Sequence, residues 1–125
     1  MGLLSGLLGN ASSVDAGQIN RQLAPILAAN ETVELAFQFV RDQFVFTNWR
    51  LILIDKHGLT GKKVEYLSIP YRSITRFAIE TAGHFDLDAE LKLWIAGDAQ
   101  PLVKELRGGA HVAAIQKALA TAMFS

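Results

Sequence analysis

The chain has 125 residues, half of them apolar, no cysteine, and twelve basic residues balanced by twelve acidic ones. This length and composition predict one globular domain that needs no disulfide. The lack of cysteine gives no reason to expect an oxidising compartment. The balanced charge argues against a global electrostatic attraction to nucleic acid or to an anionic membrane, so nucleic acid is not an expected partner.

Residues 1–30 are expected to form an apolar tail followed by a helical segment. The tail reads GLLSGLLG from Gly2 to Gly9, and Arg21 is the first basic residue, so the charge pattern of a secretion signal is missing. Eight residues are also too few to cross a hydrocarbon layer about 30 Å thick. We therefore expect a cytoplasmic protein whose tail packs on its own domain, on a neighbouring subunit, or weakly on a membrane.

The pattern from Ser12 to Ala29 is helical, and Asp15 is placed to cap it. Pro25 interrupts this segment, because proline removes an amide donor and clashes with the preceding turn. Two short helices or one kinked helix are therefore expected before Asn30. The apolar stripe consists of Ile19, Leu23, Ile26 and Leu27.

The clearest strand signal is FDLDAELKLWI, from Phe85 to Ile95, in which every second residue is apolar. Such alternation fits a strand with one buried and one exposed face, and it fits no helix. Six further extended runs have short connections, which make neighbouring strands antiparallel. After Gly108, helical spacing of apolar residues predicts a closing helix. The seven predicted strands are Thr32–Val40, Gln43–Thr47, Arg50–Asp55, Lys63–Ile69, Ile74–Thr81, Phe85–Ala96 and Leu102–Arg107.

These elements predict a mainly β (α+β) fold. Four strands and then three would curl into two nearly orthogonal sheets of a bent, seven-stranded antiparallel barrel, and the C-terminal helix would cap its open end. Residues 31–125 would form this barrel and helix, and residues 1–30 would precede it within a single domain overall. The same order of elements is found in pleckstrin-homology (PH) barrels.

Three sequence blocks resemble the family of bacterial pleckstrin-homology domain proteins. They are FVFTNWRLILID at Phe44–Asp55, GLTGKKVEYLSIPYRSITRF at Gly58–Phe77, and ETAGHFDLDAELKLWI at Glu80–Ile95. The resemblance covers essentially the whole chain and implies the PH fold. It implies no particular activity, because this family has no established biochemical activity.

No group of residues in the sequence points to catalysis. A nucleophile, a base and an orienting group would have to converge, and no such set is recognisable. Asp86, Asp88 and Glu90 form a row with about 6.5 to 7 Å between successive members, which is too wide to chelate one ion without another segment. We therefore expect no enzyme activity, metal or cofactor, and we expect the row to be solvated or to pair with a neighbouring strand or subunit. The histidines fall in predicted turns or at the start of the last helix, at His57, His84 and His111.

One basic cluster surrounds the loop after the third strand. Lys56, Lys62 and Lys63 are its lysines, and they are candidates for contact with an anion or a lipid headgroup. A hydrated hairpin tip is the alternative interpretation.

The second and third strands are apolar on both faces, since Phe44 and Phe46 alternate with Val45. Whichever set enters the barrel, another apolar set needs a cover, which either the N-terminal helix or another copy of the protein would supply. Trp94 on a polar strand face and Trp49 in a turn are aromatics of the kind that anchor interfaces. The predicted interface residues are Phe44, Phe46, Trp49 and Trp94.

The family resemblance also implies assembly, because its members form closed, ring-shaped homo-oligomers with pentamers favoured. We therefore expect a non-catalytic PH-like domain that forms a ring and presents a surface to an unidentified protein partner. The alternative is a peripheral membrane adaptor, in which the N-terminal tail and the Lys56–Lys63 loop bind an anionic lipid surface.

Overall fold

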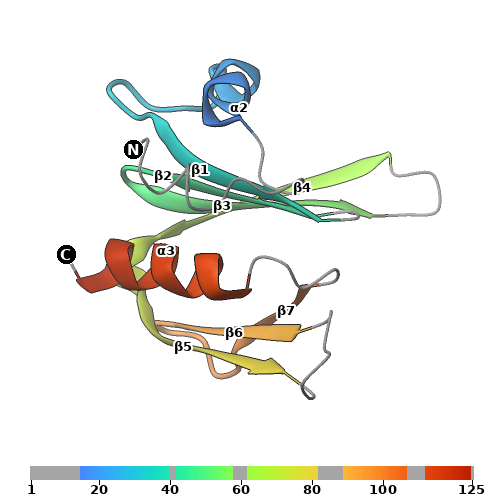
Figure 1. Ribbon diagram of the computed structural model, residues 1–125, viewed down its shortest axis with the longest axis vertical. Coiled ribbons are helices and arrows are strands. Elements are labelled where there is room, and N and C mark those ends of the chain that lie inside the picture. The colour runs from blue at the N-terminus through green and yellow to red at the C-terminus, as the bar shows by residue number, and fades with distance from the viewer. Residues whose placement is uncertain (1–14, 40–41, 58–61, 82–88, 107–111, 125) are drawn as a thin grey trace. The chain divides into compact units, whose positions relative to one another are not determined.

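The computed structural model describes residues 15–39, 42–57, 62–81, 89–106 and 112–124. The chain divides into two compact units, Met1–Ile69 and Pro70–Ser125. Among the described residues, the first unit contains a short helix and four strands, and the second contains three strands and the C-terminal helix (Figure 1). All seven predicted strands and both predicted helical segments are represented there, most of them with shifted boundaries.

Helix α2 (Ala16–Leu23) begins where the sequence provides a cap and ends just before its proline. The Asp15 carboxylate accepts a hydrogen bond from the Gly17 amide at 2.9 Å, which satisfies one of the free donors of the first turn. At the other end Pro25 has no amide hydrogen for the Arg21 carbonyl, which accepts from the Ala24 amide instead. The segment predicted between Ser12 and Ala29 is therefore one short helix within the described residues.

The first unit is built on an antiparallel sheet in the order β1-β2-β3-β4. Phe37 of β1 lies opposite Phe44 of β2, and Val45 of β2 lies opposite Ile52 of β3. Strand β4 occupies one edge of this sheet. The strands are β1 (Val33–Gln38), β2 (Asp42–Thr47), β3 (Arg50–His57) and β4 (Lys63–Pro70).

Helix α2 covers one face of this sheet, as Figure 1 shows. Ile19 and Leu23 of the helix belong to the same buried cluster as Val45 and Ile52 of the strands. The chain itself therefore supplies a cover for the second apolar face of β2 and β3, which was one of the two alternatives left open by the sequence. Burial of these aliphatic groups holds the helix on the sheet.

The second unit contains the antiparallel sheet β5-β6-β7. In β6, Leu91 and Leu93 are fully buried and Lys92 and Trp94 are half-buried, so the predicted alternation is confirmed where it is described. Residues 85–88 of the predicted strand lie outside the described residues. The elements are η1 (Tyr71–Ser73), β5 (Ile74–Thr81), β6 (Ala89–Ile95), β7 (Leu102–Leu106) and α3 (Val112–Phe124).

Helix α3 packs one side against its own unit. Ile115 and Leu119, one turn apart, are completely buried, and Ala114 and Ala118 flank them. The helix contacts β5 and the short helix η1.

The predicted division into four strands and then three is confirmed. The described strands form two separate hydrogen-bonded sheets, as expected, and these sheets are not closed into a barrel by hydrogen bonds between them. The consecutive strands β4 and β5 belong to different sheets, and η1 intervenes between them.

Candidate interaction surface

A buried carboxylate organises one end of the first unit. The Glu31 side chain is fully buried, and both of its oxygens accept hydrogen bonds. Oε1 accepts from the Ala28 amide at 2.9 Å and from Arg50 Nη2 at 3.0 Å. Oε2 accepts from Arg50 Nε at 2.8 Å and from Thr47 Oγ1 at 2.7 Å. This bidentate pairing is the geometry in which arginine binds carboxylates most strongly.

The environment of Glu31 keeps it ionised. Burial by itself raises the pKa of this carboxyl, because a charge is costly to remove from water. The hydrogen bonds from Arg50, the Ala28 amide and Thr47, together with the charge of Arg50, outweigh burial and lower the pKa below its usual value. Glu31 therefore stays negative and keeps its partners at neutral pH.

Arg50 connects three segments of the first unit. Besides Glu31, its guanidinium donates to the Ile26 carbonyl at 2.9 Å and to Ser68 Oγ at 2.7 Å. These partners lie on the connection after α2 and on strand β4. The β2–β3 turn, the α2–β1 connection and β4 are thus held together at this end of the sheet.

Trp49 lies in the β2–β3 turn, whose main chain is held by hydrogen bonds. Thr47 Oγ1 accepts from the amides of Trp49 and Arg50, at 3.0 and 2.9 Å. Asn48 bonds the adjacent connection through its side chain, which accepts from the Thr32 amide and donates to the Asn30 carbonyl. The Trp49 side chain nevertheless stays 48% exposed, so the turn presents a large aromatic whose main chain is already fixed.

Strand β4 exposes apolar side chains at the edge of the sheet. Val64 and Tyr66 are 39% and 54% exposed. The bond between Arg50 and Ser68 places Ser68 on the face that Arg50 shares with Ile52, and α2 covers that face. Because side chains alternate along a strand, Val64 and Tyr66 lie on the same face as Ser68. The helix therefore leaves the β4 part of this face open to solvent.

On the polar face of the second sheet, one lysine lies close to two glutamates. Glu80 and Glu90 lie directly opposite each other, an arrangement that is unfavourable for like charges. Lys92 relieves it, with Nζ 2.9 Å from Glu80 Oε1 and 3.9 Å from Glu90 Oε1. The hydrogen bond and charge of Glu80 raise the pKa of Lys92. Glu90 thus pairs with Lys92 of its own strand, β6, and Asp86 and Asp88 lie outside the described residues.

Trp94 lies on the same polar face, beside an arginine. The register pairs it with Arg76, whose guanidinium carbon is 4.3 Å from the ring centroid, a cation–π contact. Val103 of β7 lies opposite Lys92 and so shares this face. It is 44% exposed. Trp94 and Val103 are diagonal neighbours across β6 and β7, within reach of an aromatic ring.

The interface residues predicted from the sequence divide into two groups. Phe44 and Phe46 are 0% and 3% exposed, so their placement on an open interface is corrected. Trp49 is exposed and Trp94 is half-buried, and an interface role for both stays a prediction. The aromatics of β2 are buried beside one another and beside β1, with Phe37 and Phe46 edge to face at 6.0 Å.

The predicted basic residues are not gathered into one site. Lys56, Lys62 and Lys63 are all exposed; Lys56 lines a cleft beside α2, which the other two do not line. The loop between them, residues 58–61, lies outside the described residues, as do His84 and His111. Within the described residues no three metal-binding side chains come together, and no helix is long and apolar enough to cross a membrane.

Sequence reasoning missed the Glu31–Arg50 pair and the exposed residues of β4 and β7. Glu31 and Arg50 are 19 positions apart, and no periodic pattern links them. Val64 and Tyr66 carried a usable signal, because they share one strand face with Ser68 in a strand that was predicted to within one residue of its end.

Comparisons with known proteins give matches that extend over nearly the whole chain. The sequence model of the family described as "Bacterial PH domain" matches residues 2–123. The uncharacterized protein YjqA of Bacillus subtilis (strain 168) is 54% identical over 96% of this chain and 97% of its own length. The uncharacterized protein YozO of the same organism is 36% identical over 70% of this chain and 73% of its own length.

Two solved structures have a closely similar fold. The pleckstrin homology domain from Shewanella amazonensis SB2B gives a TM-score of 0.87 at 58% identity, covering 98% of this chain and 99% of that one. A DUF1696 family protein with a pleckstrin-homology domain from Shewanella loihica PV-4 gives 0.78 at 56% identity, covering 92% and 98%. The PH fold expected from the sequence is thereby confirmed.

Proposed function

We propose that this chain, which belongs to the bacterial PH domain family, assembles with copies of itself into a closed ring and serves, without catalysis, as a platform for protein partners. The observation that carries this proposal is the exposed apolar edge strand β4, with Val64 and Tyr66 open to solvent. An edge strand offers a row of main-chain donors and acceptors to another strand. Large exposed apolar groups beside that row favour pairing.

The complementary surface is the β7 edge of the second sheet. Val103 on β7 and Trp94 on β6 share one face. If β7 of one subunit pairs with β4 of the next, Val103 becomes a cross-strand neighbour of Val64 and Tyr66, and Trp94 lies one strand further into the joined sheet, on the face that it shares with Val103. The two surfaces differ, so the contact is heterologous and repeats from subunit to subunit until a ring closes.

Trp49 is assigned a different role, as the contact residue for a protein partner. Its turn is fixed by the Glu31, Thr47 and Arg50 network, so little backbone freedom is lost when a partner binds. A partly exposed tryptophan on a rigid turn has the character of a binding hot spot. A ring would repeat this site in every subunit and would raise avidity for a multivalent partner without new contacts.

Engineered disulfides test the β4–β7 contact, since the chain has no cysteine of its own. Under mild oxidation the double variant Val64→Cys, Val103→Cys should form a ladder of covalent oligomers that stops at one size. Each single variant should stay free of such a ladder. The matched control is Glu34→Cys with Gln116→Cys, two exposed positions on β1 and α3, outside the proposed contact.

Centrifugation of the same protein with lipid vesicles distinguishes the protein-binding platform from the membrane adaptor. The platform predicts that the protein stays in the supernatant when it is centrifuged with phosphatidylglycerol vesicles. Salt-sensitive co-sedimentation, with no covalent ladder from the double variant, would refute the platform and support the adaptor.

A further inference from the structure

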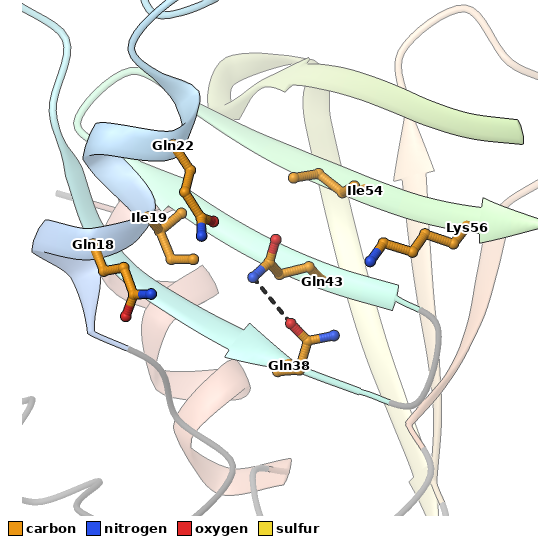
Figure 2. Close-up of a pocket in the computed structure, with 7 residues that line it drawn as sticks. All are labelled: Gln18, Ile19, Gln22, Gln38, Gln43, Ile54 and Lys56. Atoms are coloured by element: carbon orange, nitrogen blue, oxygen red, sulfur yellow. Dashed lines mark hydrogen bonds between the residues drawn. The ribbon is translucent and has the colours of Figure 1, made fainter. Parts of the chain in front are cut away.

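A cleft of about 300 Å³ opens between helix α2 and the ends of three strands (Figure 2). Four glutamines line it: Gln18 and Gln22 from the helix, Gln38 from β1 and Gln43 from β2. Lys56 of β3 is the only charged residue among the described residues of the lining. The volume lies at the small end of the range for ligand sites, and it corresponds to about ten water molecules.

The cleft marks the place where one sheet face changes from apolar to polar. Under the helix this face carries Val45 and Ile52, which are buried. Further along the same strand faces, two residues from Val45 and four residues from Ile52, Gln43 and Lys56 replace aliphatic side chains. Gln18 and Gln22 stand one helical turn apart and face these strand residues across the cleft (Figure 2).

Two of the carboxamides are fixed in orientation. Gln38 Nε2 donates to the carbonyls of Phe39 and Asp42, at 2.9 and 3.4 Å. Its oxygen must therefore face Gln43, whose Nε2 donates to it at 3.1 Å. The second amide hydrogen and the oxygen of Gln43 are left for another partner.

The remaining polar groups of the cleft are open to a ligand. In the described part of the chain, the side chains of Gln18 and Gln22 make no hydrogen bond to another residue, and Figure 2 shows the Lys56 side chain reaching toward Gln43. Carboxamides both donate and accept, as hydroxyl groups do, and the ammonium group attracts one negative charge. Ile19 and Ile54 add an apolar surface for the carbon skeleton of a ligand.

We infer that this cleft binds a small polyhydroxylated monocarboxylate, the class of the sugar acids. The carboxylate would pair with Lys56, and the hydroxyl groups would exchange hydrogen bonds with Gln22 and Gln43. Among the described residues that line the cleft, none has an acidic side chain that would repel such an anion. A neutral sugar would lack the ion pair, and a simple carboxylate would lack the hydroxyl contacts.

The test is a titration of the full-length, ¹⁵N-labelled protein with D-glucuronate, followed by the side-chain amide resonances of its glutamines. The resonances of Gln22 and Gln43 should shift and reach saturation. Lys56→Gln should weaken binding about fivefold, as expected for a solvent-exposed ion pair. Gln22→Ala should weaken it by a similar factor through a lost hydrogen bond.

Controls define what would overturn the inference. Gln116→Ala and Lys62→Gln change the same residue types at exposed positions outside the cleft, and both should bind glucuronate like the parent protein. D-Glucose and acetate should each bind at least fivefold more weakly. Unchanged Gln22 and Gln43 resonances, acetate as effective as glucuronate, or equal affinity in Lys56→Gln would each refute the site.

Discussion

Arg50 holds both carboxylate oxygens of Glu31, through Nε at 2.8 Å and Nη2 at 3.0 Å. The carboxylate is completely buried, whereas the arginine side chain is 24% exposed. The pair therefore depends on its hydrogen bonds to offset the loss of hydration. It also determines how the turn with Trp49 is presented, because Thr47 bonds both the carboxylate and the Trp49 amide.

Breaking this pair should destabilise the fold. Glu31→Gln removes the charge and leaves the Arg50 guanidinium without its counterion, so we expect a loss of about 3 kcal/mol in the free energy of unfolding. This value is at the low end for a broken buried pair, because Arg50 is partly solvated. Urea unfolding measures it. Glu34→Gln, an exposed change three residues further on in β1, should cost less than about 0.5 kcal/mol, and equal losses in both variants would contradict the assignment.

The same residue should make stability depend on pH. The folded pKa of Glu31 is lowered from an ordinary value of 4.5, so in acid the unfolded chain binds the proton first. Its contribution is fully present above pH 4.5 and is lost as the pH falls through the folded pKa. Unfolding free energies measured from pH 6 downward should therefore fall more steeply for the parent protein than for Glu31→Gln. Parallel curves would show that Glu31 does not titrate in this way.

Much of this fold was predictable because it depends on local patterns. The alternation around Leu91 and Leu93 predicts the buried face of β6, and Asp15 and Pro25 predict the limits of α2. The sequence pattern did not predict which apolar face of β2 is covered by α2. Period two separates Phe44 and Phe46 from Val45, but it does not say which set α2 covers. Both sets are buried, so the sequence overestimated the apolar surface left for a partner.

Packing of α2 on the sheet gives a further prediction. Ile19 is 5% exposed and belongs to the same cluster as Val45 and Ile52. Ile19→Ala should destabilise the protein by about 2 to 4 kcal/mol, because it removes buried methyl groups and leaves a cavity. Thermal or urea unfolding would measure this loss. The neighbouring change Gln18→Ala, at an exposed position, should leave stability almost unchanged, and a similar loss there would argue against packing as the cause.

Trp94 should contribute to assembly and Lys62 should not. Trp94→Ala removes a large ring beside Val103 and frees Arg76 from its cation–π contact, so the dissociation constant between subunits should rise at least tenfold. Lys62→Ala changes an exposed residue that precedes β4 and removes no apolar contact. Dilution series by analytical ultracentrifugation would compare the two, and equal effects, or none, would count against a role for Trp94.

The most direct measurement is the molar mass of the purified protein by light scattering at micromolar concentration. The ring predicts one species whose mass is a fixed multiple of 13.7 kDa. Tyr66→Glu, which places a charge in the β4 contact, should reduce it to the single chain. A parent protein that runs only at 13.7 kDa, or an assembly that Tyr66→Glu and Val103→Glu both leave intact, would contradict self-assembly through β4.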